Sequence, residues 1–175
     1  MESQENRSDR TALLVAVPAA EPVVGGLRAR FDRSASRGMP AHITVVFPFL
    51  PATAAVVTEL RSIIAAVPRF TVTLASVGWF GQRVVWLAPE PAGPLRELTR
   101  LVVDRFPGVR PYDGRFTEVV PHLTVGHDQP HRVLLDAAAE VEPQLPIDVP
   151  VSSVHLMASV AGGNWNTVAT FELGC

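Results

Sequence analysis

The chain has 175 residues, of which 47% are hydrophobic and 18% charged, and its formal net charge is −2. This composition excludes a disordered chain and a coiled coil, and no apolar run reaches the roughly 18 residues that a membrane span needs. All 15 basic residues are arginine, which excludes a P-loop lysine, a Schiff base and a lysyl-nucleotide intermediate. The single cysteine, Cys175, excludes an intramolecular disulfide and a multi-thiolate zinc site.

The N-terminal residues are polar and contain no apolar segment of the kind found in secretory signals. We therefore expect a flexible tail over 1–10, one domain over 11–175 and a cytoplasmic location. The acidic net charge argues against a surface that binds duplex DNA, because such surfaces are usually basic. Any phosphate-bearing ligand is expected to be small or short, and the chain is expected to act as a monomer without a membrane partner.

Strand and helix signals alternate along the chain without a linker. Apolar and β-branched runs predict strands at 11–17, 42–47, 70–77, 83–88, 122–126, 147–160 and 165–173. Apolar residues at helical spacing predict helices at 21–31, 54–67, 94–106 and 131–141. Thr53 is typical of an N-cap, and Pro68 stops the helix that follows it.

Seven strands and four helices, in an order that mixes βα units with hairpins, predict an α+β fold in which helices cover antiparallel sheets. The sequence contains no G-x-G-x-x-G, G-x-x-x-x-G-K or G-x-S-x-G pattern. A nucleotide site of the Rossmann or P-loop type and a serine nucleophile elbow are therefore unsupported.

Two short segments, each just after a proline, share the pattern histidine, aliphatic, threonine, aliphatic. They are His42-Ile43-Thr44-Val45 and His122-Leu123-Thr124-Val125. Residues i and i+2 of a strand face the same side, about 6.6–7 Å apart. Each strand should therefore present one imidazole and one hydroxyl to one side, and its aliphatic residues to the core. The copies lie in different halves of the chain, which indicates an internal duplication.

Two imidazoles and two hydroxyls suit the cleavage of a phosphodiester without a metal. A neutral histidine can take a proton from the attacking water or ribose hydroxyl, while a protonated one gives a proton to the leaving oxygen. The threonine hydroxyls can bond the non-bridging phosphate oxygens. Which histidine is the acid and which the base stays open.

With these motifs the chain resembles the two-histidine (2H) phosphoesterases, which include 2'-5' RNA ligase-like proteins and 2',3'-cyclic nucleotide phosphodiesterases. The resemblance covers nearly the whole chain and implies two pseudo-symmetric α+β lobes around a central cleft, with one motif on each lobe. It implies acid–base catalysis by His42 and His122, phosphate binding by Thr44 and Thr124, and no metal or cofactor. We expect a phosphodiesterase acting on 2',3'-cyclic phosphate or 2'-5' linked nucleotides. Reversible ligation without ATP, or a nucleotide-binding module with little turnover, is the alternative.

Three further residues are candidates for substrate binding. Tyr112 and Arg115 precede the second motif in a loop, where the ring could stack on a base and the guanidinium could meet a phosphate, unless the loop is an ordinary surface loop. His155, in His155-Leu156-Met157, resembles a motif without its hydroxyl and lies in the cleft wall or in ordinary packing. His127 and His131 have the spacing of metal ligands, but Pro130 interrupts any helix between them, so we expect no metal site there.

Overall fold

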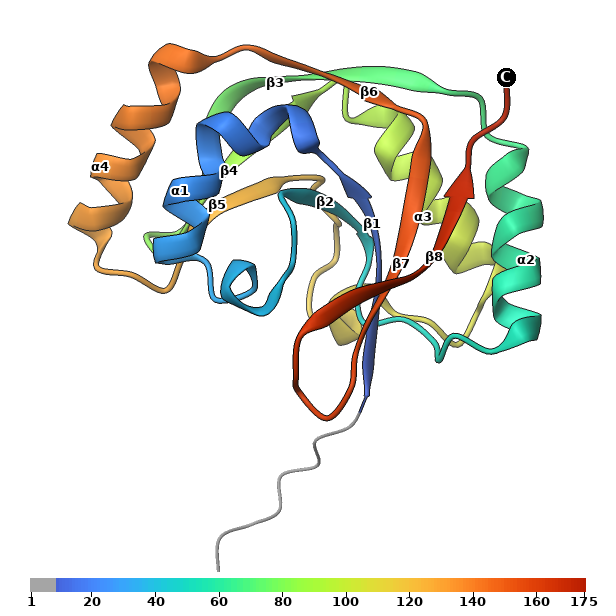
Figure 1. The fold of residues 1–175 in the computed structure, drawn as a ribbon. Helices are drawn as coiled ribbons and strands as arrows, with labels where there is room; N and C mark the ends of the chain where they lie inside the picture. Colours follow the sequence, from blue (N-terminus) through green and yellow to red (C-terminus); the bar gives the residue numbers. More distant parts are fainter. Residues whose placement is uncertain (1–8) are drawn as a thin grey trace, which may run out of the picture.

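The computed structural model describes residues 9–175, which form two four-stranded antiparallel sheets (Figure 1). The first sheet has the order β2-β1-β7-β8 and contains β1 (Arg10–Ala16), β2 (His42–Val46), β7 (Ser153–Ser159) and β8 (Trp165–Glu172). The second has the order β5-β4-β3-β6 and contains β3 (Phe70–Phe80), β4 (Val84–Glu90), β5 (Leu123–His127) and β6 (Ile147–Val151). The two strands that carry the His-x-Thr motifs, β2 and β5, are edge strands of different sheets.

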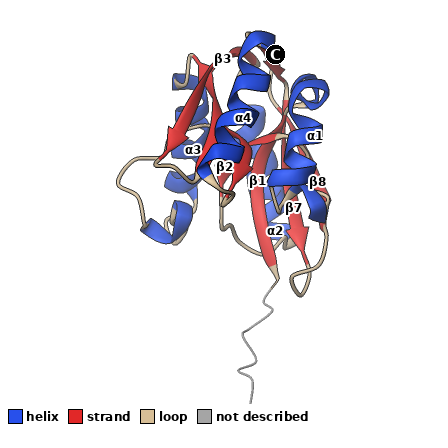
Figure 2. Ribbon diagram, turned by 90° about the vertical axis from the view of Figure 1, so that its left-hand side faces the viewer, coloured by secondary structure: helices blue, strands red, loops and turns tan. Residues whose placement is uncertain are grey.

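Two pairs of α-helices cover the sheets (Figures 1 and 2). They are α1 (Glu21–Phe31) and α4 (His131–Val141) on the second sheet, and α2 (Ala54–Ala65) and α3 (Gly93–Arg105) on the first. Helix α1 follows a strand of the first sheet but packs against β5 of the second, so it ties the two halves together. The predicted α+β class is confirmed.

Local signals place the helices where the sequence predicts them. The Thr53 side chain accepts a hydrogen bond from the Val56 N–H at 3.3 Å and caps α2, because the first turn of a helix leaves its N–H groups without partners. Helix α3 has Pro94 in its first turn, where the missing N–H costs nothing.

The strand expected at 147–160 is wrong as a single element. It is two strands in different sheets: β6 pairs with β3, whereas β7 pairs with β1 and β8. The buried positions change phase at the break, because Val149 and Val151 are followed by Val154 and Leu156. Strand β3 also runs on to Phe80, three residues past the predicted end, so the hairpin turn lies at 81–83.

One apolar core joins both sheets. It contains Ile43 and Val45 from β2 together with Leu123 and Val125 from β5, each at most 2% exposed. The aliphatic halves of both motifs are therefore packed away from solvent, as the alternation predicts, and the histidines and threonines between them are less deeply buried than these aliphatic residues.

The first strand begins close to the position that the sequence predicts. Arg10 is the first residue of β1, one residue earlier than expected, and residues 1–8 of the expected tail lie outside the described residues. From residue 9 to residue 175, no helix combines the length and apolar character that crossing a membrane requires.

Candidate active site

A cavity of about 460 Å³ lies where the two motif strands, which contact each other, come together. Its walls come from both sheets, from the loop after α1 and from the loop before β5. The lining residues are Asp32, Ser34, His42, Phe80, Val84, Tyr112, Phe116, Glu118, Val120, His122, Thr124 and His127. The structure thus brings together two histidines that are far apart in the chain.

Both histidines are held by the same kind of hydrogen bond, from the ring to a backbone carbonyl two residues earlier. Nδ1 of His42 lies 2.7 Å from the Pro40 carbonyl oxygen, and Nδ1 of His122 lies 2.7 Å from that of Val120. A carbonyl oxygen can only accept, so each Nδ1 carries the proton and donates it. In the neutral ring this leaves Nε2 with a free lone pair, available for proton transfer.

Burial governs the charge of both rings. It lowers the pKa of His42 to about 4, although the hydrogen bond to the Pro40 carbonyl opposes the shift. The positive charge of Arg28 lowers this pKa further, as His122 does when it is protonated, and the Asp32 carboxylate raises it. Burial also lowers the pKa of His122, against the bond to Val120. Both imidazoles are therefore neutral at pH 7 in the free protein.

The two threonines occupy different places. Thr124 lines the cavity, whereas Thr44 does not line it directly and is hydrogen-bonded to the side chain of Tyr112, which does. Burial raises the pKa of the Tyr112 phenol and the bond to Thr44 opposes this shift, so the phenol is protonated at neutral pH.

Tyr112 is anchored in an uncommon backbone conformation. Its φ is 52°, in the left-handed region that non-glycine residues rarely adopt. Its N–H donates to the Phe47 carbonyl oxygen at 2.6 Å, just beyond β2. The loop that leads into the second motif therefore reaches back to the strand of the first, and such strain is common at functional sites.

Aromatic side chains form much of the remaining wall. The ring of His122 lies 4.9 Å from that of Phe80 and 5.8 Å from that of Trp86, measured between centroids. The exposed ring of Phe116 packs edge-on against Tyr112 at 5.7 Å. Phe80 ends β3 in the hairpin with β4, where the sequence favours aromatic packing over a place in a binding site, so its position in the wall is a finding of the structure. Phe116 has no sequence signal beyond its being an aromatic residue in the loop before the second motif.

Two predicted substrate contacts lie outside the cavity wall. Arg115 is exposed in the loop before β5. His155 and Thr44 both pair with Leu14, so they share a face of the first sheet, two strands or about 10 Å apart. His155 instead bonds to the Thr170 hydroxyl at 3.1 Å.

His127, whose spacing from His131 is that of metal ligands, lines the cavity. Across residues 9–175, no group of three or more His, Cys, Asp or Glu side chains is arranged to hold a metal ion.

Comparisons with known proteins bear on the family and the fold. A family profile described as the 2'-5' RNA ligase superfamily matches residues 16–163. "Putative phosphoesterase GK0864" of Geobacillus kaustophilus (strain HTA426) is 27% identical over 154 residues, spanning 84% of this chain and 86% of that protein. The crystal structure of Escherichia coli LigT complexed with 3'-AMP has a TM-score of 0.60 at 22% identity, covering 95% of this chain and 99% of that one. The crystal structure of TT0787 from Thermus thermophilus has a TM-score of 0.59 at 21% identity, covering 93% and 97%.

The lowered pKa of His42 predicts a loss of stability in acid. A histidine whose pKa is about 4 when folded and 6.5 when unfolded binds fewer protons in the folded state, so its contribution is present above pH 6.5 and is lost towards pH 4. From this residue alone, the free energy of unfolding should be roughly 2 kcal/mol lower at pH 5 than at pH 7. Urea unfolding of the wild type and of His42→Gln measures this. An equal pH dependence in both proteins would contradict it.

The aromatic wall depends on a glycine. A Cβ at Gly78 would lie 2.5 Å from the Trp86 ring, which crosses directly over this position. Gly78→Ala should displace Trp86, change its fluorescence and lower the free energy of unfolding by about 1–3 kcal/mol. Gly26→Ala is the matched control, because the new methyl group in helix α1 would meet nothing within 4 Å. The control should be neutral or stabilising, and equal losses in both variants would contradict the prediction.

Proposed function

Because the chain belongs to the 2'-5' RNA ligase superfamily, as its two motifs predict, we propose that it hydrolyses 2',3'-cyclic phosphate or 2'-5' linked nucleotides by two-histidine acid–base catalysis. The observation that carries this proposal is the pair of imidazoles in one cavity, each with Nδ1 bonded to a backbone carbonyl and Nε2 free. The two rings supply both proton transfers that the reaction needs.

The proposed step is an attack of water on phosphorus. Nε2 of one neutral histidine takes a proton from the water as the new P–O bond forms. The bond from phosphorus to the ribose oxygen breaks, and the second, protonated histidine gives that oxygen its proton. A cyclic phosphodiester becomes a phosphomonoester and a ribose hydroxyl, and the assignment of acid and base to His42 and His122 stays open.

The threonine hydroxyls are proposed to hold the phosphate. Thr124 lines the cavity beside His122, and Thr44 shares the cavity-facing side of β2 with His42. Each hydroxyl can donate to a non-bridging oxygen, whose charge is redistributed in the transition state. Tyr112, bonded to Thr44, orients that hydroxyl and extends the polar surface.

The cavity also suits the rest of a nucleotide. Phe80, Phe116 and Tyr112 offer ring faces on which a base can stack, and such stacking tolerates any base. LigT, which shares this fold, has been crystallised with 3'-AMP, NADP+ and ATP. These complexes support a small nucleotide as the substrate here, with the exposed Arg115 proposed to contact a flanking phosphate.

The charge of the cavity favours a singly charged phosphodiester. Among residues 9–175 no arginine lines it, its two carboxylates, Asp32 and Glu118, are each paired with an arginine outside the wall, and both imidazoles are neutral at pH 7, so no unpaired positive charge awaits a dianion. A phosphomonoester carries close to two negative charges at neutral pH. The product should therefore bind more weakly than the substrate, which favours its release, and hydrolysis is proposed over ligation because water is in excess.

Removing either imidazole should abolish turnover. His42→Ala and His122→Ala are each expected to lower kcat for 2',3'-cyclic mononucleotides at least ~10³-fold, and the double variant should lose little more because the two rings act as a unit. The assay contains excess chelator, and His131→Gln, outside the cavity, is the control. Full activity in either alanine variant would reject the roles assigned. Tight binding without turnover would indicate a binding module, and joined RNA ends without ATP would indicate a ligase.

Removing a threonine hydroxyl should weaken transition-state stabilisation while leaving the strand intact. Thr124→Val and Thr44→Val keep the side-chain shape and remove only the hydroxyl. We therefore expect kcat to fall about 10²-fold with a smaller change in KM. Thr73→Val, on β3 outside the cavity, should retain wild-type kinetics. Wild-type kcat in both motif variants would exclude phosphate binding by these hydroxyls.

The pH dependence of kcat/KM should be bell-shaped and displaced towards acid. Activity needs one neutral and one protonated imidazole, and burial lowers the pKa of both. As pH rises through the higher of the two pKa values the acid is lost, and as pH falls through the lower one the base is lost. The optimum is therefore expected below about pH 6.5, the ordinary pKa of a histidine. An alkaline optimum, with the protein folded throughout, would contradict this.

A further inference from the structure

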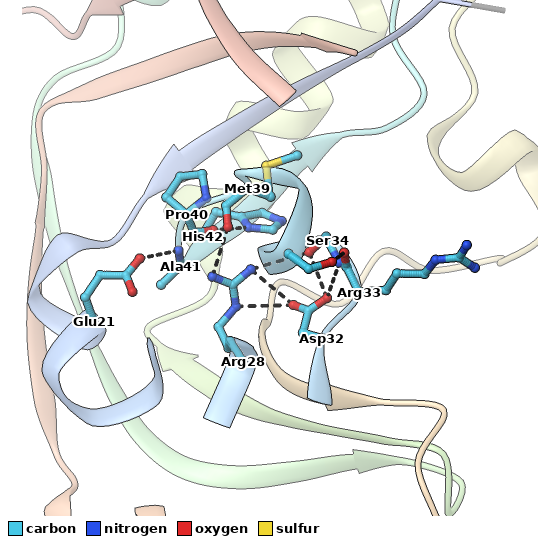
Figure 3. Close-up of polar contacts among 10 residues, drawn as sticks. Glu21, Arg28, Asp32, Arg33, Ser34, Met39, Pro40, Ala41 and His42 are labelled. Atoms are coloured by element: carbon cyan, nitrogen blue, oxygen red, sulfur yellow. Dashed lines mark hydrogen bonds and ion pairs between the residues drawn. The ribbon is translucent and has the colours of Figure 1, made fainter. Parts of the chain in front are cut away.

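A buried ion pair lies beside His42 and takes no part in the proton transfers described above (Figure 3). Arg28, near the end of α1, is 2% exposed, and the side chain of Asp32, just after the helix, is 8% exposed. The Arg28 guanidinium donates twice to one oxygen of Asp32, from Nε at 3.2 Å and from Nη2 at 3.1 Å. Both residues are close enough for their charges to affect the pKa of His42.

The same ion pair fixes the loop that leads into β2. Nη1 of Arg28 donates to the Met39 carbonyl oxygen at 3.2 Å, and Nη2 also reaches the Ser34 hydroxyl at 3.4 Å. The other carboxylate oxygen of Asp32 accepts from the Ser34 N–H at 3.0 Å and from its hydroxyl at 2.8 Å. Both ends of the 34–39 loop are thus tied to one buried pair.

The backbone held in this way is the backbone that orients His42. The carbonyl bonded by Arg28 belongs to Met39, and the next carbonyl, of Pro40, accepts the bond from His42 Nδ1 (Figure 3). The following N–H, of Ala41, donates to the Glu21 carboxylate at 2.6 Å. Three successive residues before the histidine are therefore each held by a defined partner, two of them from α1.

His122 has no counterpart of this arrangement. Its ring makes the same bond to the second residue before it, but between residues 9 and 175 no buried ion pair lies behind that carbonyl. The rings of Phe80 and Trp86 flank His122 instead. The two histidines thus share the bond and differ in what supports it, which makes His122 an internal control.

We propose that Arg28 and Asp32 are positioning residues for His42. They hold the Met39–Pro40 backbone so that the Pro40 carbonyl keeps the imidazole in its Nδ1–H form, with Nε2 available in the cavity. The planar, five-donor guanidinium can bind Asp32, Met39 and Ser34 at once, which a lysine ammonium cannot do with the same geometry. The consequence for turnover rests on the proposed function, whereas the consequence for the imidazole does not.

Three variants test the proposal. Arg28→Lys keeps the positive charge and loses the planar set of guanidinium donors. Arg28→Met combined with Asp32→Leu removes both charges together. Ser34→Ala removes the hydroxyl that bonds to Arg28 and Asp32 and leaves the charges unchanged. The mild Ser34→Ala variant provides the test if either other variant fails to fold. Phe171→Leu, a fully buried change on β8, is the control for general destabilisation.

The first readout is histidine ¹⁵N NMR at mildly alkaline pH, which reports which ring nitrogen carries the proton. The wild type should show the Nδ1–H form for both His42 and His122. The first two variants should give a mixture of both forms at His42 alone, and Ser34→Ala a smaller change in the same direction. Phe171→Leu should leave both rings unchanged. An unchanged His42 signal in every folded variant would overturn the proposal.

The second readout is kinetic. With cyclic mononucleotides, Arg28→Lys and the double variant should lower kcat about 10–100-fold, as expected for groups that orient a reacting residue, with KM changed less than about threefold. Phe171→Leu should keep its kcat below its melting temperature. A kcat within about twofold of wild type in a folded double variant would overturn the effect on turnover. If the wild type hydrolyses no cyclic nucleotide, the proposed function fails and the NMR result alone decides the positioning role.

Discussion

The candidate site depends on a period-two alternation in two edge strands whose aliphatic residues are locked into one shared core. Ile43 and Val45 on β2 and Leu123 and Val125 on β5 are almost fully buried, and the residues between them turn to the opposite side. A slip of one residue in either strand would place a histidine in the core and an aliphatic residue in the cavity. That exchange would bury polar groups and expose apolar ones. The packing of the core therefore also decides that the histidines and threonines face the cavity.

The two halves of the site are related by pattern and differ in their surroundings. Each histidine bonds to the carbonyl two residues before it, so the sequence repeat is also a structural repeat. Around this shared bond, α1 supplies an ion pair to His42, whereas β3 and β4 supply aromatic rings to His122. This asymmetry arises because α1 crosses from the first sheet to pack on the second. This asymmetry fits the proposal that the two imidazoles serve different roles, one as acid and one as base.

The buried ion pair is better explained by geometry than by stability. Removing two charges from water costs several kcal/mol per ion, and a buried pair often adds little net stability. Arg28 and Asp32 instead fix the conformation of the 34–39 loop, because the side chain of each bonds either to this loop or to the other member of the pair. This fits the proposed positioning of His42 by residues that take no part in the proton transfers themselves. Asp32 and Ser34 from this hydrogen-bonded network line the cavity, as does the exposed ring of Phe116 in the loop before β5.

Several features of this protein follow from local sequence alone. Thr53 caps its helix because a hydroxyl there satisfies a free N–H, and the His-x-Thr segments face one side because strands have a period of two. These rules act over a few residues, so the α+β class, the helices and the two motifs could be predicted. The change of phase between Val151 and Val154 was also present in the sequence, and it marks the passage from β6 to β7 that the prediction missed.

Tertiary structure alone decided which strands pair and what else lines the cavity. Nothing near Asp32, Phe80 or Phe116 in the sequence indicates that they meet His42 and His122, because their proximity comes from pairing between distant strands and from the path of α1. The same non-local packing leaves Arg115 exposed and turns His155 towards Thr170, although both lie close to motif-like residues in the chain. Short-range sequence patterns specify which face a side chain takes, whereas the neighbours on that face depend on contacts between segments that the chain itself separates.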